Sequence, residues 1–150
     1  MCSVISKASR FIVAFLFMGV LSHVAQSQNI TCSSDNGELL TCVVTVTGIK
    51  EKKAVSSAES ALRSALFFRG IPDSKHCKQP LVGTDESFAA SHPQYFKEMF
   101  EKGRFATFIT NTEFLSYTKK KKISVISFTI NIRALRLDLE SQGVKRRFGL

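Results

Sequence analysis

The sequence predicts an α+β domain with a mainly antiparallel sheet of about three to four strands and helices packed on one side. Stretches rich in β-branched and aromatic residues predict strands over residues 38–49, 105–118 and 123–132, and only four lysines separate the last two, as in a hairpin. Alanines at helical spacing predict a helix after the first strand. Because strands and helices do not alternate regularly, the order favours α+β over a parallel α/β sheet.

The first 27 residues have the layout of a secretory signal peptide. Lys7 and Arg10 precede an apolar run over residues 11–21, and small residues follow up to Ser27, which predicts cleavage after Ser27. The run of 11 residues is too short for a membrane span, which takes about 20 helical residues. We therefore expect a periplasmic or secreted protein whose mature chain, residues 28–150, is a single domain without a transmembrane segment.

The mature chain is basic and has an odd number of cysteines. Without Lys7 and Arg10 it has 19 basic residues against 12 acidic ones, a formal net charge of +7, which favours encounters with anionic surfaces. Its cysteines are Cys32, Cys42 and Cys77. In an oxidising compartment three cysteines allow one disulfide and leave one thiol.

An Asn-Gly dipeptide between Cys32 and Cys42 is a strong hairpin-turn signal. A two-residue loop would place Cys32 beside Thr41, whereas a three-residue loop over residues 36–38 places it opposite Cys42. Directly opposed residues lie about 4.5 to 5.5 Å apart at Cα, within disulfide reach. We therefore favour a disulfide between Cys32 and Cys42, with Cys77 unpaired.

The alanine-rich helix over residues 54–68 is expected to lie close against the sheet and to end at Gly70 and Pro72. The segment 70–92 then has loop composition over about 23 residues, which is long for a compact domain. We expect this 70–92 loop to be functional, packed as its own small unit or partly disordered.

The end of this helix has two interpretations. In the structural one, Phe67, Phe68 and Ile71 plug one end of the sheet, and a carboxylate or backbone carbonyls hold Arg69. In the functional one, Arg69 and the 70–92 loop form a binding surface.

The remaining elements follow from capping and periodicity. Residues 93–105 predict a short amphipathic helix that Pro93 opens, and residues 133–142 predict a final helix with Asn131 as its N-cap. In the strand over 123–132 the apolar parity changes after position 125, which predicts burial on both faces or a bulge there.

The sharpest catalytic hypothesis pairs Cys77 as nucleophile with His92 as base. His76 is adjacent in sequence and poorly placed to activate the sulfur, no nucleophile signature surrounds Cys77, and the preceding helix end disfavours a thiolate. The histidines and cysteine of the 70–92 loop also lack metal-site spacing. We therefore expect no catalytic residue, metal or cofactor; the alternative is a small enzyme or ligand-binding protein with Arg69, Cys77 and His92 in its site.

Two basic stretches could contact polyanions. Four lysines at a hairpin tip more often form a solvated turn that protects the adjacent strands from aggregation, so nucleic acid is not the partner we favour. This basic patch comprises Lys119, Lys120, Lys121, Lys122, Lys145, Arg146 and Arg147.

Three segments carry a family likeness: VTGIKEKKAVSSAESALRSALFFRGIPDS, FITNTEF and TINIRALRLDLESQGVKRRFG. They resemble a family of exported proteins of Gram-negative bacteria, in which a V-T-G strand leads into an alanine-periodic helix and A-L-F-F-R-G-I-P-x-S, and the chain closes with I-N-x-x-A-L-R-x-D-L-E. The resemblance implies export and no particular activity. The V-T-G strand and its helix are more loosely similar to small envelope lipoproteins and to the N-terminal domain of flagellar assembly protein T, although the lipid-bearing cysteine is missing here.

These observations predict an exported, non-enzymatic module that acts through contact with an envelope or extracellular protein. Polyanion binding through the basic patch is a further alternative.

Overall fold

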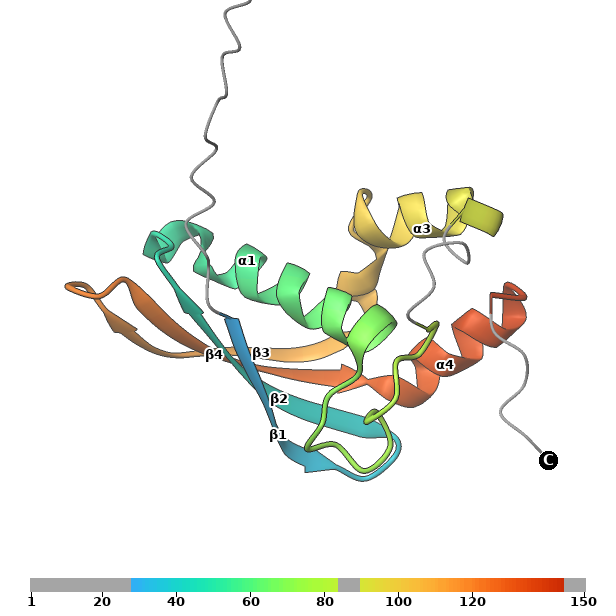
Figure 1. Cartoon of the computed structure of the whole chain (residues 1–150), viewed down its shortest axis with the longest axis horizontal. Coiled ribbons are helices and arrows are strands. Elements are labelled where there is room, and N and C mark those ends of the chain that lie inside the picture. The colour runs from blue at the N-terminus through green and yellow to red at the C-terminus, as the bar shows by residue number, and fades with distance from the viewer. Residues whose placement is uncertain (1–27, 84–89, 145–150) are drawn as a thin grey trace, which may run out of the picture.

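The structure is a computed structural model that describes residues 28–83 and 90–144 (Figure 1). The predicted signal peptide and the basic residues Lys145, Arg146 and Arg147 lie outside the described residues. The strands are β1 (Gln28–Asp35), β2 (Leu39–Thr47), β3 (Ile109–Thr118) and β4 (Ile123–Asn131). The helices are α1 (Glu51–Ser64), α3 (Pro93–Phe100) and α4 (Ile132–Ser141), with a π-helical turn at Ala65–Arg69 and a 3-10 turn at Arg104–Phe108.

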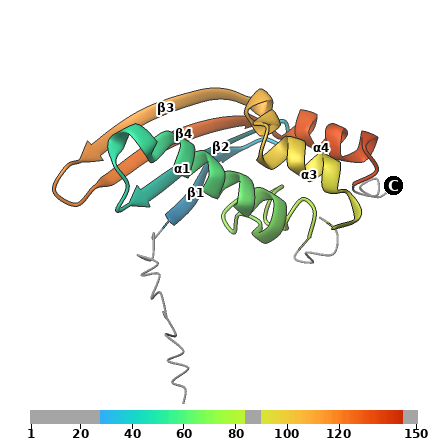
Figure 2. The same cartoon turned by 90° about the horizontal axis from the view of Figure 1, so that it is seen from above.

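The four strands form one antiparallel sheet in the order β1-β2-β4-β3. Helices α1 and α3 lie on the same side of the sheet, and α4 continues from the end of β4 (Figures 1 and 2). The predicted α+β class and antiparallel sheet are confirmed. No helix among the described residues has the length and apolar character needed to cross a membrane.

The core lies between the sheet and α1. Side chains of β2 and β4 alternate between buried positions and half-buried ones, apart from the exposed Leu39 at the start of β2, so each strand turns one row toward the helix. Helix α1 meets this row with small residues, which lets the helix approach the sheet closely. The buried residues of α1 are Ala54, Ala58, Ala61 and Leu62.

The parity change expected in the last strand has a different origin from the predicted one. Strand β4 is regular, because the polar Ser124 occupies a fully buried position and leaves Val125 on the opposite face. The bulge is in the neighbouring strand, where Leu115 is the extra residue between the partners of Ile126 and Val125. The alternative of a bulge is therefore wrong for β4, whereas the alternative of burial on both faces holds in part, since the residues opposite the buried row are half-buried.

The predicted start of β3 is wrong, whereas the predicted N-cap of α4 is confirmed. The strand expected from Phe105 begins only at Ile109, because the chain leaves Gly103 with φ +74° and forms a 3-10 turn that buries Phe105. The cap of α4 is as predicted, since Asn131 Oδ1 accepts a hydrogen bond of 2.9 Å from the backbone N–H of Ala134.

Candidate functional site

An aromatic cluster forms where α1 ends. The π-helical turn buries Phe67, whose ring centroid lies 5.3 Å from that of Phe100 and 6.2 Å from that of Phe96. Both contacts are edge-to-face, a favourable arrangement for aromatic pairs. Phe67 and Ile71 thus plug the end of the core, as the structural interpretation predicted, whereas Phe68 stays half-buried.

Phe68 forms one wall of a groove whose other wall is α3. The Phe68 and Phe96 rings are stacked with centroids 6.0 Å apart, and the Phe100 ring lies 5.7 Å from Phe68. The residues of α3 on the groove are spaced by three and four positions, so they form one face of the helix. We call this feature, about 470 Å³ in volume, the aromatic groove; it is lined by Phe68, Pro93, Phe96, Lys97, Phe100 and Glu101.

Arg63 lies at the edge of the aromatic groove. Its guanidinium carbon sits 4.5 Å from the centroid of the Phe100 ring, a cation–π contact. Its Nη2 donates a long hydrogen bond of 3.4 Å to Ser60 Oγ, and its buried Nε has no hydrogen-bond partner in the described part of the chain. Burial lowers the pKa of Arg63, opposed by the charge of Glu59. The groove therefore combines an aromatic floor with the Arg63 guanidinium group, not all of whose N–H groups donate hydrogen bonds to the described residues.

A second candidate centres on Asp35, whose side chain is only 2% exposed. Its Oδ1 accepts from the backbone N–H of Gly37 at 3.0 Å and lies 2.8 Å from Nδ1 of His76. Its Oδ2 accepts from the Ser74 hydroxyl and, at 2.8 Å, from the backbone N–H of His76. Burial alone would raise the pKa of Asp35, but these hydrogen bonds outweigh it and hold the pKa well below its usual value.

Cys77 is not arranged as a nucleophile. Its sulfur is buried 3.6 Å from Nη2 of Arg136, and the same guanidinium group donates to the carbonyl of His76. Burial raises the pKa of the Cys77 thiol, although the charge of Arg136 opposes this. Because the carboxylate Asp35 also binds this loop, the cluster fastens the described part of the 70–92 loop to the β1–β2 hairpin.

The predicted site residues His92 and Arg69 lie elsewhere. His92 precedes α3, where its Nδ1 is 2.9 Å from Ser91 Oγ, in a groove that it shares with Tyr95 and Glu98 rather than with Cys77. Arg69 is exposed at the edge of a shallow groove with Gln28 and Pro72. Its side chain makes no hydrogen bond or ion pair with the described residues, so the expected contact with a carboxylate or carbonyl is not found there.

A polar cluster joins α3 to α4 beside the His92 groove. Asp138 accepts from the Tyr95 hydroxyl at 2.8 Å and from Nη2 of Arg104 at 2.5 Å. Burial and the bond to Asp138 raise the pKa of Tyr95. The phenol therefore stays a neutral donor, and the cluster positions α3, which carries one wall of the aromatic groove.

Cys32 and Cys42 are directly opposed in the β1–β2 hairpin, as the three-residue loop predicted. The loop differs from the predicted one, because Asp35 pairs with Leu40 and four residues lie between them. A bulge at Ser33 then brings Cys32 opposite Cys42 again. All three described cysteines are thiols in this structure, so the disulfide remains a prediction.

Protein isolated from an oxidising compartment is expected to contain one Cys32–Cys42 disulfide and one free thiol, Cys77. Closing so short a loop should raise the free energy of unfolding by about 2 to 3 kcal/mol relative to the reduced protein. Thiol titration of the denatured protein and peptide mapping measure the bond, and denaturation with and without reductant measures its effect. A Cys77→Ser variant should keep the full reductant effect. Three free thiols, or a peptide linked through Cys77, would contradict the pairing.

Among the described residues, no three His, Cys, Asp or Glu side chains are grouped so that they could hold a metal ion. Comparison of this chain with protein-family models, with curated proteins and with solved structures finds no match.

Proposed function

We propose that the protein is an exported, non-enzymatic module that binds a partner protein of the cell envelope through the aromatic groove. The observation that carries this proposal is the pair of half-buried rings, Phe68 and Phe100, beside Arg63. Aromatic residues, phenylalanine included, and arginine are enriched at protein–protein interfaces. An apolar floor with the charged residues Lys97 and Glu101 at its edge also has the layout of an interface core with a polar rim.

The groove favours one kind of partner. An apolar side chain of the partner would lie over the Phe68 and Phe100 rings, where it would bury the aromatic surface that they leave exposed. A carboxylate beside that side chain would accept hydrogen bonds from the terminal N–H groups of Arg63, whose side chain forms no salt bridge within the described residues. We therefore expect the bound segment to carry an apolar residue next to an Asp, a Glu or a free C-terminus.

The rival enzyme hypothesis has less support. Burial raises the pKa of the Cys77 thiol, which lowers the thiolate fraction near neutral pH. His92 lies on the α3 side of the molecule in a different groove, and His76 contacts Asp35 through Nδ1. Fast alkylation of Cys77 at neutral pH would revive the enzyme hypothesis.

The test compares affinity purification from the envelope of a Gram-negative host for three forms of the tagged full-length chain. Replacing both Phe68 and Phe100 with serine should lower recovery of the partner at least about tenfold, since each ring is expected to act as a hot spot. The matched control is Leu137→Ser, which removes a 57% exposed apolar side chain on α4. Its partner recovery should equal that of the wild type.

Circular dichroism must show that the groove variant is folded. If it is not, Arg63→Gln is the second variant, because it keeps the aromatic packing and removes the cation. Full recovery of the partner by a folded groove variant or by Arg63→Gln would contradict the proposed site.

A further inference from the structure

The fold brings together two lysine runs that lie far apart in the sequence. Thr47 pairs with Ile123 at the end of the sheet, and the backbone N–H of Gly48 donates to the carbonyl of Lys122 at 3.0 Å. The start of α1 therefore lies beside the β3–β4 turn. We call the exposed residues of this region the lysine end: Lys50, Lys52, Lys53, Lys119, Lys120, Lys121 and Lys122.

The positive charge of the lysine end is not neutralised within the described residues. Their four salt bridges include none of these lysines, and Glu51 is the acidic residue within the first run. Helix α1 also begins here, and no side chain caps its first N–H groups, so its dipole adds partial positive charge. Concentrated charge of one sign is best matched by an anionic surface outside the molecule.

Exposed apolar side chains lie on the two elements that carry the lysine end. Val55, one turn into α1, is 37% exposed, and Phe114 and Leu115 of β3 are 39% and 47% exposed. Lysines around a few apolar side chains are typical of surfaces that rest on a bilayer, because the cations meet phosphates while the apolar groups enter the headgroup layer. A nucleic-acid duplex, whose outer surface is made of phosphates, would leave these apolar groups without a matching surface.

We propose that the lysine end docks onto a bilayer that carries anionic phosphate headgroups. All seven cations are lysines, which bind phosphates as point charges and lack the planar fork with which arginine reads bases. The cluster therefore suits binding to an anionic membrane surface better than recognition of a nucleic-acid sequence. Its members come from the start of α1 and the β3–β4 turn, which form one protruding end of the molecule (Figure 1).

Docking at this end leaves the aromatic groove accessible. The lysine end is at the start of α1, whereas the groove is formed by Phe68, just beyond the end of α1, and by α3 (Figures 1 and 2). A molecule bound to a bilayer through the lysine end would thus present the groove to a partner on its opposite side. The membrane proposal stands on its own, since it uses no residue of the groove.

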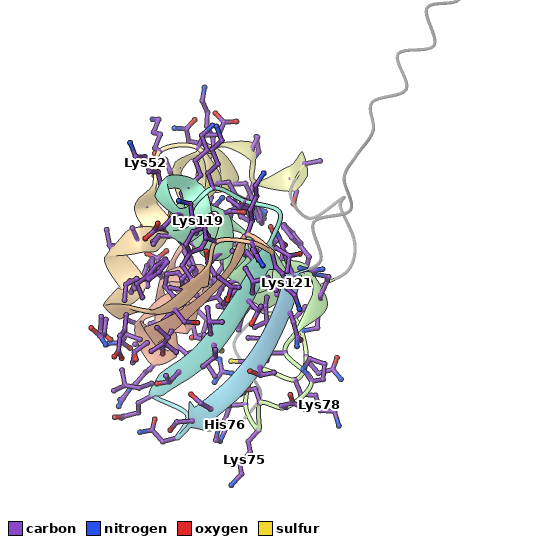
Figure 3. The ribbon with its side chains drawn as sticks, turned by 90° about the vertical axis from the view of Figure 1, so that its left-hand side faces the viewer. Lys52, Lys75, His76, Lys78, Lys119 and Lys121 are labelled. Carbon is purple, nitrogen blue, oxygen red and sulfur yellow. The ribbon has the colours of Figure 1, made fainter. Side chains whose placement is uncertain are left out.

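The test is co-sedimentation of the protein, as isolated from the host, with two kinds of vesicle. One kind contains phosphatidylcholine alone, and the other also contains about 30% phosphatidylglycerol, which gives it an anionic surface. Binding should require the anionic lipid and weaken as salt is added. Changing Lys52, Lys119 and Lys121 to glutamate should lower the partition coefficient at least about a hundredfold. Figure 3 views the molecule from this end and labels these three lysines.

The matched control reverses three exposed lysines outside the lysine end, Lys75, Lys78 and Lys102, so that the net charge changes equally. Figure 3 shows Lys75 and Lys78 beside His76 in the lower part of that view. The control should lose much less binding than the lysine-end variant. The proposal would be overturned if both variants lost binding equally or if the lysine-end variant bound as well as the wild type. It would also be overturned if the protein bound a 20-base RNA (about two turns of helix) more tightly than vesicles at the same phosphate concentration.

Discussion

Replacing Gly70 with alanine is expected to lower the free energy of unfolding by more than about 3 kcal/mol, enough to unfold much of the protein. Gly70 has φ +79°, and a Cβ there would lie 2.1 Å from the carbonyl oxygen of Lys78. The obstacle is backbone, which has little freedom to move because Ile71 N–H donates to the Cys77 carbonyl at 2.7 Å. Urea denaturation followed by circular dichroism measures the effect.

Gly103 provides the control for this prediction. It has a similar φ of +74°, but nothing lies within 4 Å of the position that a Cβ would take. Gly103→Ala should therefore cost only the backbone strain, about 1 to 2 kcal/mol. Equal losses of stability in the two variants would show that the close approach of Lys78 has no importance.

Replacing Asp35 with asparagine is expected to lower the free energy of unfolding by roughly 3 kcal/mol at neutral pH. The buried carboxylate accepts hydrogen bonds from Ser74, His76 and Gly37, and an amide side chain would turn two N–H donors toward these donors. The described part of the 70–92 loop should also loosen. Thermal unfolding and hydrogen exchange at residues 74–77 measure both effects.

The pH dependence distinguishes a charged role of Asp35 from simple packing. The pKa of Asp35 is lower in the folded protein than its unfolded value of about 3.9. Its contribution to stability is therefore complete above the unfolded pKa and is lost as pH falls below about 4 toward the folded pKa. The contribution of the Asp35 carboxylate to the difference in stability between the wild type and Asp35→Asn should be fully present at about pH 5 and should shrink below about pH 4.

Glu38→Gln is the control for Asp35. Glu38 pairs with Arg133 at 2.6 Å, but the two side chains are 64% and 67% exposed, so the variant should change stability by less than about 1 kcal/mol. If Asp35→Asn were equally mild, or if its effect persisted unchanged at pH 3, the buried carboxylate would not hold the loop as described.

Elements that depend on local chemistry were predictable from the sequence. Helix α1 follows from alanine periodicity, and the cap of α4 follows from Asn131. The Asn-Gly signal predicted the β1–β2 hairpin, but the opposition of Cys32 and Cys42 also depends on the bulge at Ser33, which no local signal predicted. Of the two alternatives for the last strand, a bulge in β4 is not found, because a parity change does not tell a buried polar residue such as Ser124 from an irregular backbone.

The surfaces to which we assign a function by proposal were less predictable, because they join residues that are distant in the sequence. Asp35 meets His76 only through packing of the 70–92 loop on the hairpin, and the lysine runs meet only through the register of β2 with β4. Phe68 and Phe100 have the helical periodicity of core residues. Their partial exposure depends on where α3 lies, which no local signal specifies.

The central claim is that the aromatic groove binds a partner protein, and site-specific photo-crosslinking in intact cells tests it most directly. A photoreactive amino acid at Lys97, on the exposed rim of the groove, is compared with the same amino acid at Leu137 on α4. The account predicts one discrete protein adduct from position 97 that disappears when Phe68 and Phe100 are also changed to serine, and none from position 137. The same adduct from both positions, or an adduct at position 97 that survives loss of the two rings, would contradict it.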